Sequence, residues 1–509
     1  MQQQGLGEFE KLNKLESFSK EELISKFSIL EDEYLRAVKE IYRLKYQDLT
    51  DDQLRLVMAE QLKYFRDEMF GQSSERYKKP ENKKKDPAAE TPKPRIKRPS
   101  ERYPNIPVRE VLITMDPRPG CEACGSLMSD SGMTEDSEQL NVIPKKYEII
   151  LQMRAKYRCQ CQGCIITTPN PPRIIEGSSY SDEMIQDVSL SKYCDLIPMG
   201  RYAAMAGRSG LKDLPAQSLI ELTHGFADFL QPVYQMIKQS ILIARVLNAD
   251  ETPHKMLEGS DKKSWYLWGF STLANCFLEY HDTRSGDVAS DVLINSKCEV
   301  LVTDVYSGYG KAVRVVNQSR LLKSQIPIEN GYCNAHARRY FYKCRESYKE
   351  AEFYLDHYHL IYELNSRAKG QSDAIVLELR SEMKSHFEAI RSQALNEVSR
   401  YPGPSKYGKA LNYFMGNYDG LTLFLTDAEV PIDNNSQERL LRSHVVGRKT
   451  WYGTHSKRGA KTAAILFSIV ETCKLNHVNP REYFKNLVQD LLVGKNAYTP
   501  REFKDFPKS

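Results

Sequence analysis

The stretch ARVLNADETP, residues 244–253, is the one from which the fold can be worked out. Its apolar residues are typical of a buried β-strand, and Asp250 is predicted at the carboxyl end of that strand. The stretch VLVTDVYSGYG, residues 300–310, has the same character and carries Asp304. Each of two buried strands is therefore predicted to present one aspartate at its end.

A third stretch, VPIDNNSQERLLR at 430–442, is predicted as a loop that enters a helix, and it carries Glu438. Two aspartates at strand ends and a glutamate on a later helix are the ligand set of a two-metal site for phosphoryl transfer. Mg²⁺ prefers oxygen ligands and keeps several waters, so a few carboxylates suffice. An aspartate at a strand end is also commonly a turn former or a helix cap, which leaves a structural interpretation open.

Five motifs in this sequence resemble one known family. They are ADETP, TDVYSGYG, CNAHARRYF, IDNNSQERLLR and GRKTWYGTHSKRGAKTAAILFSIVETCKLNHVNPREYF. In this order they resemble the DDE transposases of the insertion-sequence-66 family, and the resemblance extends from about Phe70 onward. It implies a catalytic triad of Asp250, Asp304 and Glu438 that holds two Mg²⁺ (or Mn²⁺) ions.

The same resemblance implies a DNA transposase that cleaves and transfers the strands of an insertion sequence. Its implied partners are DNA, both element ends and target, and the small accessory proteins of the same element. Glu251 and Asp433 lie beside triad residues and are not expected to be ligands. Two alternatives remain open: an inactive zinc-containing DNA-binding protein that acts as a repressor, and an RNase H-like nuclease that cuts without joining.

Length and composition set broad limits on the kind of protein. A chain of 509 residues should contain several domains, and 41% hydrophobic with 27% charged residues is typical of a globular protein. The sequence has no run of about 18 apolar residues, which predicts no membrane span, and no apolar signal core at its start. The eleven cysteines, an odd number, predict a reducing compartment, hence a cytoplasmic protein. The resemblance to DNA transposases implies that it is nucleoid-associated. A net charge of +5 means that DNA binding must come from local patches.

The N-terminal region, residues 1–76, is predicted to be helical and similar to a coiled coil or leucine zipper. Apolar residues recur at three- and four-residue steps from Ile24 to Leu44, and Thr50 with Gln53 forms a capping box. Such a stripe buries against a second copy, giving a homo-oligomer, or folds back on its own chain. Residues 77–102 form a basic, Pro-rich linker that is either a solvated spacer or an arm that contacts DNA.

Residues 103–176 are predicted to form a small zinc-binding, β-rich domain. Cys121 and Cys124 make one Cys-x-x-Cys pair, and Cys161 with Cys164 makes a second, which together suit a four-thiolate Zn²⁺ site. Cys159 is an alternative to Cys161, because the family pattern would select the cysteine after Tyr157. The segment between the two pairs alternates as strands do, and reduced buried cysteines are the competing interpretation.

The remaining regions complete a multidomain α/β fold. Residues 177–245 are predicted to be helical, either as a DNA-binding helix-turn-helix or as packing around the core. Residues 246–445 match the order of an RNase H-like catalytic domain, with strands joined as hairpins, a helix and a parallel return strand. The long interval before Glu438 predicts an α-helical insertion at about 348–428. Residues 446–509 are predicted to be basic and helical.

Two further groups of residues are candidates for the site. Cys333 and His336 are either half of a metal site or, more simply, part of a strand feeding a helix, with His336 hydrogen-bonded near the carboxylates. Cations interleaved with aromatic rings suit a strand end, since charge holds phosphates and rings stack on bases. The residues expected to contact DNA are Arg338, Arg339, Arg442, Arg448, Lys449, Trp451, Tyr452, Lys457 and Arg458. The glycines at 447, 453 and 459 predict a loop-rich segment rather than a plain helix there.

Overall fold

The structure is a computed structural model, and it divides into two compact units. It describes residues 36, 37, 40, 50, 53, 55, 57–60, 98–114, 119–128, 133–158, 164–257, 262, 264–401 and 403–506. The larger unit comprises Met1–Ser73, Gln152–Arg208 and Lys212–Ser509, and the smaller one comprises Ser74–Leu151 with Ser209–Leu211. Among the described helices, none combines the length and the apolar character that a membrane span requires.

A five-stranded sheet organises the larger unit. Its strands are β3 (Val246–Lys255), β4 (Ser264–Ser271), β5 (Cys276–His281), β6 (Val300–Thr303) and β7 (Glu329–Tyr332). The spatial order is β5-β4-β3-β6-β7. Strands β3, β4 and β5 pair antiparallel, whereas β6 pairs parallel with β3 and β7 parallel with β6. Helix α9 (Asp287–Leu293) connects β5 to β6. The predicted hairpin strands, connecting helix and parallel return strand are therefore confirmed.

The prediction that Asp250 ends its strand is wrong. Parallel pairing of β3 with β6 stops at Asn248, but antiparallel pairing with β4 continues to Lys255, which lies opposite Ser264. Asp250 therefore sits in the middle of a long hairpin strand, two residues beyond the last one paired with β6. The physical reason is that β4 supplies a partner backbone where β6 no longer does.

The second strand is shorter than the predicted range of 300–310. β6 ends at Thr303, and helix α10 begins at Ser307. The carboxylate of Asp304 accepts a hydrogen bond from the backbone N–H of Tyr306 at 3.0 Å, which turns the chain from the strand into the helix. Asp304 consequently lies at the end of its strand, as predicted, on the strand next to β3.

Alternate residues of the central strands belong to two different hydrophobic cores. Leu247 and Leu301 join a core with helices on one side of the sheet, whereas Val300 and Val302 join a second core. This is the two-residue period of a strand buried on both faces. The first core includes α5 (Asp182–Tyr193), α6 (Met199–Arg208), α7 (Ala216–Phe229), α8 (Gln231–Leu242), α10 (Ser307–Leu322), α17 (Lys457–Leu475), α18 (Pro480–Leu492) and the flanking α19 (Pro500–Lys504).

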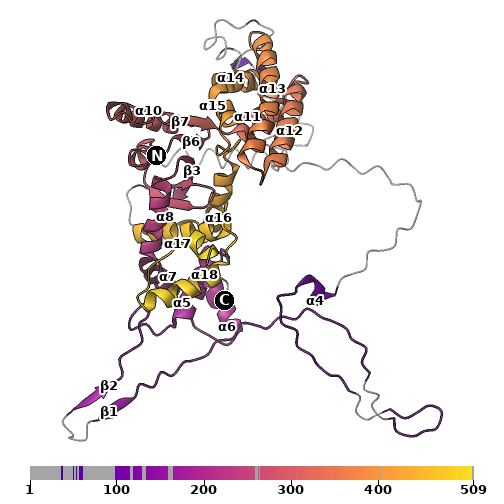
Figure 1. Cartoon of the computed structure of the whole chain (residues 1–509), viewed down its shortest axis with the longest axis vertical. Coiled ribbons are helices and arrows are strands. Elements are labelled where there is room, and N and C mark those ends of the chain that lie inside the picture. The colour runs from indigo at the N-terminus through magenta and orange to yellow at the C-terminus, as the bar shows by residue number, and fades with distance from the viewer. Residues whose placement is uncertain are drawn as a thin grey trace, which may run out of the picture. The chain divides into compact units, whose positions relative to one another are not determined.

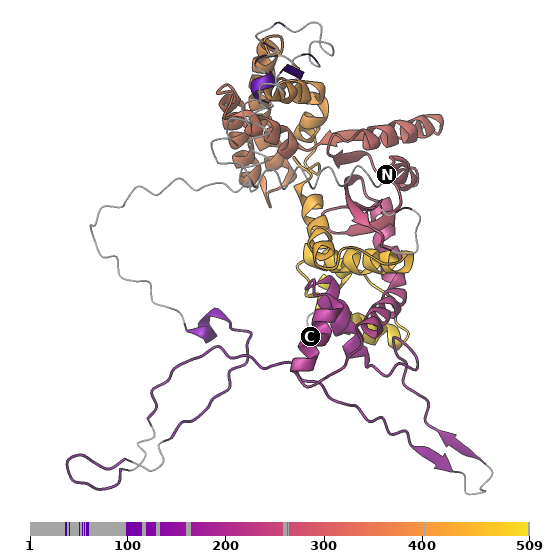
Figure 2. The ribbon, with the colours of Figure 1, turned by 180° about the vertical axis from the view of Figure 1, so that it is seen from behind.

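The second core consists mainly of helices from the predicted insertion. These are α12 (Ala351–Ala368), α13 (Asp373–Glu397), α14 (Lys406–Gly416), α15 (Tyr418–Thr422) and the short 3₁₀ helix η1 (Leu423–Thr426), which follow α11 (Asn334–Cys344). Figures 1 and 2 show these helices gathered at one end of the sheet, with α5, α7 and α17 at the other. The helices of region 177–245 thus pack into the core of the sheet, which supports the packing interpretation over a free helix-turn-helix.

Two arginines fix the point at which the insertion returns to the sheet. Arg380 on α13 is buried and donates to the backbone carbonyls of Phe424, Asp427 and Val430. Arg245, directly before β3, forms ion pairs of 2.7 Å with the carboxylates of Asp427 and Glu429. The segment that follows the helical insertion is therefore held at a defined position beside the sheet.

Part of the N-terminal region contacts this insertion. Val57 and Met58 are helical and buried, and the carboxylate of Glu60 accepts a hydrogen bond of 2.7 Å from the backbone N–H of Lys406, at the start of α14. The capping box of Thr50 with Gln53 is confirmed by reciprocal hydrogen bonds of 3.0 and 3.4 Å. The apolar stripe between Ile24 and Leu44 lies outside the described residues.

Only parts of the predicted zinc domain are described. Cys121 and Cys124 flank a tight turn in which the Cys121 N–H donates to Ser126 O at 2.8 Å, and Gly125 adopts a left-handed φ of 72°. Cys159 and Cys161 lie outside the described residues. The prediction of strands throughout the segment between the cysteine pairs is wrong for 139–155, which forms no strand ladder. Among the described residues of this region, the strand ladder joins β1 (Lys156–Arg158) with β2 (Ile165–Thr167), a single bridge pairs Gly120 with Leu127, and the short helix α4 spans Pro99–Arg102.

One buried asparagine connects the returning chain to the central strand. Asn434 precedes α16 (Asn435–Trp451) and is 1% exposed. Its amide donates to the Ala249 carbonyl at 2.8 Å and accepts from the Asn248 amide at 2.8 Å. Opposite Asp250 in β4, Gly269 has no side chain, so α16 approaches closely; a Cβ there would lie 2.1 Å from the Gln437 amide.

We predict that Asn434→Ala lowers the free energy of unfolding by about 2–4 kcal/mol, because it leaves two buried polar groups without partners. Chemical denaturation of the full chain measures this change. Asn295→Ala, at an exposed position, is the matched control and should unfold as the wild type does. Equal midpoints for Asn434→Ala and the wild type would contradict the role of this bridge.

Candidate active site

A single cavity of about 280 Å³ contains all three predicted triad residues. Asp250 comes from β3, Asp304 follows β6, and Glu438 lies in the first turn of α16. The remaining lining residues are Glu251, Thr252, His336, Arg339, Asn434, Leu441 and Val445. The structure therefore brings together residues that are far apart in the sequence, and they come from a strand, a strand end and a helix.

The carboxylates in this cavity influence one another strongly. Burial, followed by the negative charges of Glu251, Asp304 and Glu438, raises the pKa of Asp250 to about 8. Burial also raises the pKa of Glu251. Such a concentration of acidic groups in a partly buried position is unfavourable unless cations compensate it. It is therefore a site at which positive charge would be bound.

The donor chemistry fits divalent cations such as Mg²⁺ or Mn²⁺. Asp250, Asp304 and Glu438 supply only oxygen atoms, which these ions prefer. Glu438 Oε1 is buried and has no hydrogen-bond partner among the described residues. An orphaned buried carboxylate oxygen next to two aspartates is what a site for such ions requires.

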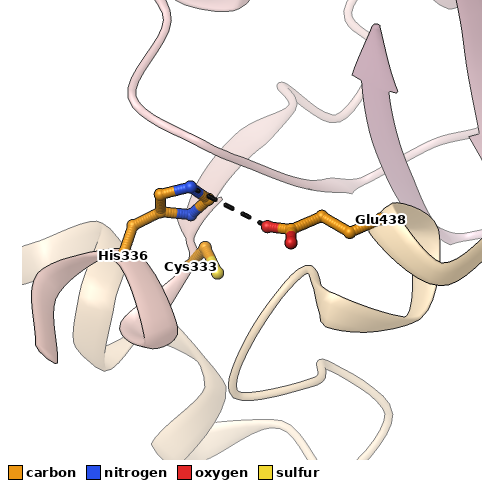
Figure 3. A group of neighbouring side chains, drawn as sticks. All are labelled: Cys333, His336 and Glu438. Atoms are coloured by element: carbon orange, nitrogen blue, oxygen red, sulfur yellow. Dashed lines mark ion pairs between the residues drawn. The ribbon is translucent and has the colours of Figure 1, made fainter. Parts of the chain in front are cut away.

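His336 and Cys333 lie beside Glu438, as Figure 3 shows. β7 feeds α11 as predicted, but the expected hydrogen bond of His336 to the carboxylates is wrong, because its Nε2 lies 3.8 Å from Glu438 Oε1. Ligand atoms of these three residues lie within 4.8 Å of one another. Burial raises the pKa of the Cys333 thiol to about 12, and its sulfur accepts a hydrogen bond from the Asn434 N–H at 3.2 Å. The neutral thiol is occupied as an acceptor, which favours the interpretation that His336 accompanies the carboxylates.

The acidic neighbours of the triad have their own partners. Asp433 accepts hydrogen bonds from the Asn435 N–H and side-chain amide and from the Tyr362 hydroxyl of α12. Glu251 forms an ion pair of 2.7 Å with Arg284 and accepts a hydrogen bond of 2.6 Å from the Tyr309 hydroxyl. These contacts give a physical reason why neither residue is expected to be a metal ligand.

The residues predicted to contact DNA differ in exposure. Arg339 lines the cavity, and Arg448 is partly buried. Arg458 is exposed and pairs with Glu221 at 3.0 Å. The other exposed members of the set are Arg338, Arg442, Lys449, Tyr452 and Lys457.

The two aromatic members of that set are in different environments. Trp451 is partly buried against the first core and lies beneath the Lys192 ammonium at 5.3 Å, whereas Tyr452 is 77% exposed. The expected loop-rich segment is wrong for Gly447, which lies within the continuous helix α16. A Cβ at Gly447 would meet the Trp451 ring at 2.6 Å, so this glycine makes room for the tryptophan. Gly459 lies in α17, and only Gly453 occupies a turn.

Sequence reasoning missed several residues that build the site. Asn434 and Asn248 hold the glutamate helix to the aspartate strand, and Arg284 with Tyr309 holds Glu251. Asn434 belongs to the IDNNSQERLLR motif, which is predicted as a loop entering a helix and gives no sign of a bridge to a distant strand. Nothing in the sequence around Arg284 indicated its role, because its partner comes from another strand.

Three curated proteins of Sinorhizobium fredii are similar over most of their length. "Uncharacterized protein y4qI" is 26% identical over 374 residues, covering 70% of this chain and 68% of the relative. "Uncharacterized protein y4hP" is 23% identical over 400 residues, covering 74% and 71%. "Uncharacterized protein y4jD" is 23% identical over 416 residues, covering 78% and 79%.

A model of one protein family matches residues 177–462, a span that begins before α5 and ends within α17. It includes the whole sheet, the helical insertion and every residue that lines the cavity. The match covers more than half of the chain, and the description of the matching family is "Transposase IS66 family". The chain belongs to the IS66 family of transposases.

Proposed function

We propose that this protein is a DNA transposase that cleaves DNA and transfers the strand of an insertion sequence in a divalent-metal-dependent reaction. The observation that carries this proposal is the meeting of Asp250, Asp304 and Glu438 in one cavity of a transposase-family chain. The strand order of the sheet, with two parallel strands added to an antiparallel hairpin unit, supports an RNase H-like core for the catalytic domain.

In this proposal the three carboxylates hold two Mg²⁺ or Mn²⁺ ions. Ions bound there would lower the pKa of an attacking water and stabilise the charge that develops on the phosphate during an in-line displacement. The hydrolysis breaks one phosphodiester bond and leaves a 3′-hydroxyl on the element end. That hydroxyl then attacks a phosphodiester of the target DNA, and the target's own 3′-oxygen leaves.

The protein's own residues position the reactants. The Ala249–Asn434 hydrogen bond keeps Glu438 opposite Asp250, and His336 lies next to the Glu438 carboxylate. Arg339 enters the cavity, where its guanidinium suits a phosphate. Exposed cations on α11, α16 and α17 then bind the DNA backbone, and Tyr452 offers a ring for stacking on a base. The accessory proteins of the same element complete the proposed set of partners.

We predict that Asp250→Asn, Asp304→Asn and Glu438→Gln each lower cleavage by at least about a thousandfold, because each removes a charge that holds the ions. Asp250→Asn should not lower the melting temperature, since it removes a buried carboxylate surrounded by other carboxylates. Incubation with element-end DNA and Mg²⁺, scoring nicked and joined products, provides the measurement.

The products of that assay separate three outcomes. Nicking with joining supports the transposase, and nicking without joining in the wild type would indicate a nuclease. DNA binding without either product would indicate a repressor. Asp433→Asn is the matched control, because Asp433 is bound by Asn435 and Tyr362, and it should retain most of the cleavage activity.

The cysteines support a second proposal, a structural zinc site. The turn at Cys121 and Cys124 offers two thiols, and hydrogen bonds from Ser126 lower the pKa of the Cys124 thiol. A lowered pKa favours the thiolate form that binds Zn²⁺. Two of Cys159, Cys161 and Cys164 would complete the four-thiolate shell.

Freshly purified, reduced protein should contain about one Zn²⁺ per chain, and Cys121→Ser should lose it. Elemental analysis by mass spectrometry measures the metal content. Cys159→Ser and Cys161→Ser, compared side by side, identify the surplus cysteine. Cys194→Ser is the control and should keep its zinc, because Cys194 caps the C-terminus of α5 and does not belong to the predicted zinc ligands. Protein without zinc before any substitution would rule the site out.

The stripe from Ile24 to Leu44 supports a third proposal, self-association. Paired protomers would hold two element ends in one assembly. Deleting the whole N-terminal region is a poor test, because Glu60 binds Lys406 in the insertion. Point substitutions that place charges on the stripe are therefore preferable.

We predict that the double substitution Leu30→Lys and Ile41→Lys gives a smaller species in solution, because charges cannot be buried in an apolar interface without partners. Light scattering measures the mass. Ser25→Lys with Asp32→Lys, on positions outside the stripe, is the control and should keep the wild-type mass. A double variant of unchanged mass would show that the stripe packs elsewhere.

A further inference from the structure

Glu251 is a fourth carboxylate in the cavity, next in sequence to Asp250. Its side chain is only 2% exposed. A buried carboxylate costs free energy unless it is paired and hydrogen-bonded. Glu251 Oε1 lies 2.8 Å from Arg284 Nε and 2.7 Å from another guanidinium nitrogen, and its Oε2 accepts a hydrogen bond from Tyr309. Both carboxylate oxygens are therefore engaged.

Arg284 also contacts the segment that carries Asp304. Its guanidinium lies over the Tyr306 ring at 4.1 Å, and the Tyr306 hydroxyl donates to the Arg284 carbonyl at 2.9 Å. The Tyr306 N–H in turn donates to the Asp304 carboxylate at 3.0 Å. A continuous set of contacts thus runs from the residue beside Asp250 to Asp304.

Tyr309 gives Glu251 a rigid second partner. It lies on the first turn of α10, is 1% exposed and packs edge-on against Trp268 of β4, with ring centroids 5.7 Å apart. Its hydroxyl cannot follow Glu251 elsewhere without disturbing this packing. The carboxylate is consequently held by one charged and one immobile neutral group.

We propose that Arg284 and Tyr309 are positioning residues that hold the buried Glu251 carboxylate out of the metal site. The inference rests on the proposed function in one respect, that Asp250 and Asp304 bind the ions. While these contacts hold, Glu251 touches neither substrate nor ion. Arg284 and Tyr309 thereby keep the ligand set at three carboxylates.

The proposal predicts an asymmetry between single and double substitutions. Arg284→Met leaves the buried Glu251 carboxylate without its cation and free to turn into the cavity as an extra ligand. Glu251→Gln with Arg284→Met removes both charges together, so no unpaired carboxylate remains. The double variant should therefore resemble the wild type more closely than Arg284→Met does, a pattern that indicates direct coupling.

The experiment uses the full-length protein and Mn²⁺ as the probe. Mn²⁺ binding without DNA is measured by electron paramagnetic resonance, and the Mg²⁺ dependence of cleavage is measured separately. Arg284→Met should lower the half-saturating metal concentration about threefold to tenfold, because the freed Glu251 carboxylate becomes an extra ligand. The double variant should return to within about twofold of the wild-type value. Tyr309→Phe should shift it in the same direction as Arg284→Met, but less. Lys311→Met, which removes a nearby cation paired with exposed Asp287, should match the wild type.

Two results would overturn the proposal. One is equal metal dependence of Arg284→Met and the double variant, and the other is loss of a bound Mn²⁺ in Glu251→Gln alone, which would make Glu251 a ligand. If Arg284→Met does not fold, Arg284→Gln takes its place, because it likewise removes the cation beside Glu251; it should shift the metal dependence in the same direction, and no shift would also overturn the proposal.

Failure of the proposed function gives a different result. In that case Asp250→Asn binds Mn²⁺ as the wild type does. The coupling of Glu251 with Arg284 can still be measured from the melting temperatures of the metal-free single and double variants. A pair with a purely structural role would change these melting temperatures but leave the metal dependence unchanged.

Discussion

Mutual repulsion among buried carboxylates is the constraint on which the rest of this structure depends. Asp250, Glu251, Asp304 and Glu438 line one cavity, and burial, followed by the charges of the other three carboxylates, raises the pKa of Asp250 to about 8. Left to themselves these groups would separate or take up protons. The fold holds them together with neutral hydrogen bonds and the Arg284 ion pair, and in the proposed function bound cations would compensate the remaining charge.

The scaffold achieves this with contacts between segments that are distant in sequence. Asn434 connects the glutamate helix to the aspartate strand, and Gly269 allows that helix to lie close to β4. Arg380 and Arg245 fix the chain where it returns from the insertion. The insertion is therefore part of the support of the site, because its exit determines where Glu438 is placed.

The insertion has a second connection to the site through Asp433. The Tyr362 hydroxyl of α12 donates to this carboxylate, which also binds the Asn435 amide at the start of α16. A displacement of α12 would thus also displace the first turn of α16, the helix that carries Glu438. Together with the contact between Glu60 and Lys406, this places the insertion between the N-terminal region and the active site.

The sequence by itself determined most of the local elements and pointed to the three carboxylates that the structure brings into one cavity. Alternating and continuous apolar runs identified β4, β5 and α17, and the spacing of motifs identified a helical insertion before Glu438. The tertiary structure alone decided that Asp250 lies within a hairpin strand, that Asn434 bridges to Ala249, and that Arg284 neutralises Glu251. The physical reason is that periodicity and capping depend on neighbours in the chain, whereas each of these contacts joins residues whose proximity arises only when the sheet and its helices have packed.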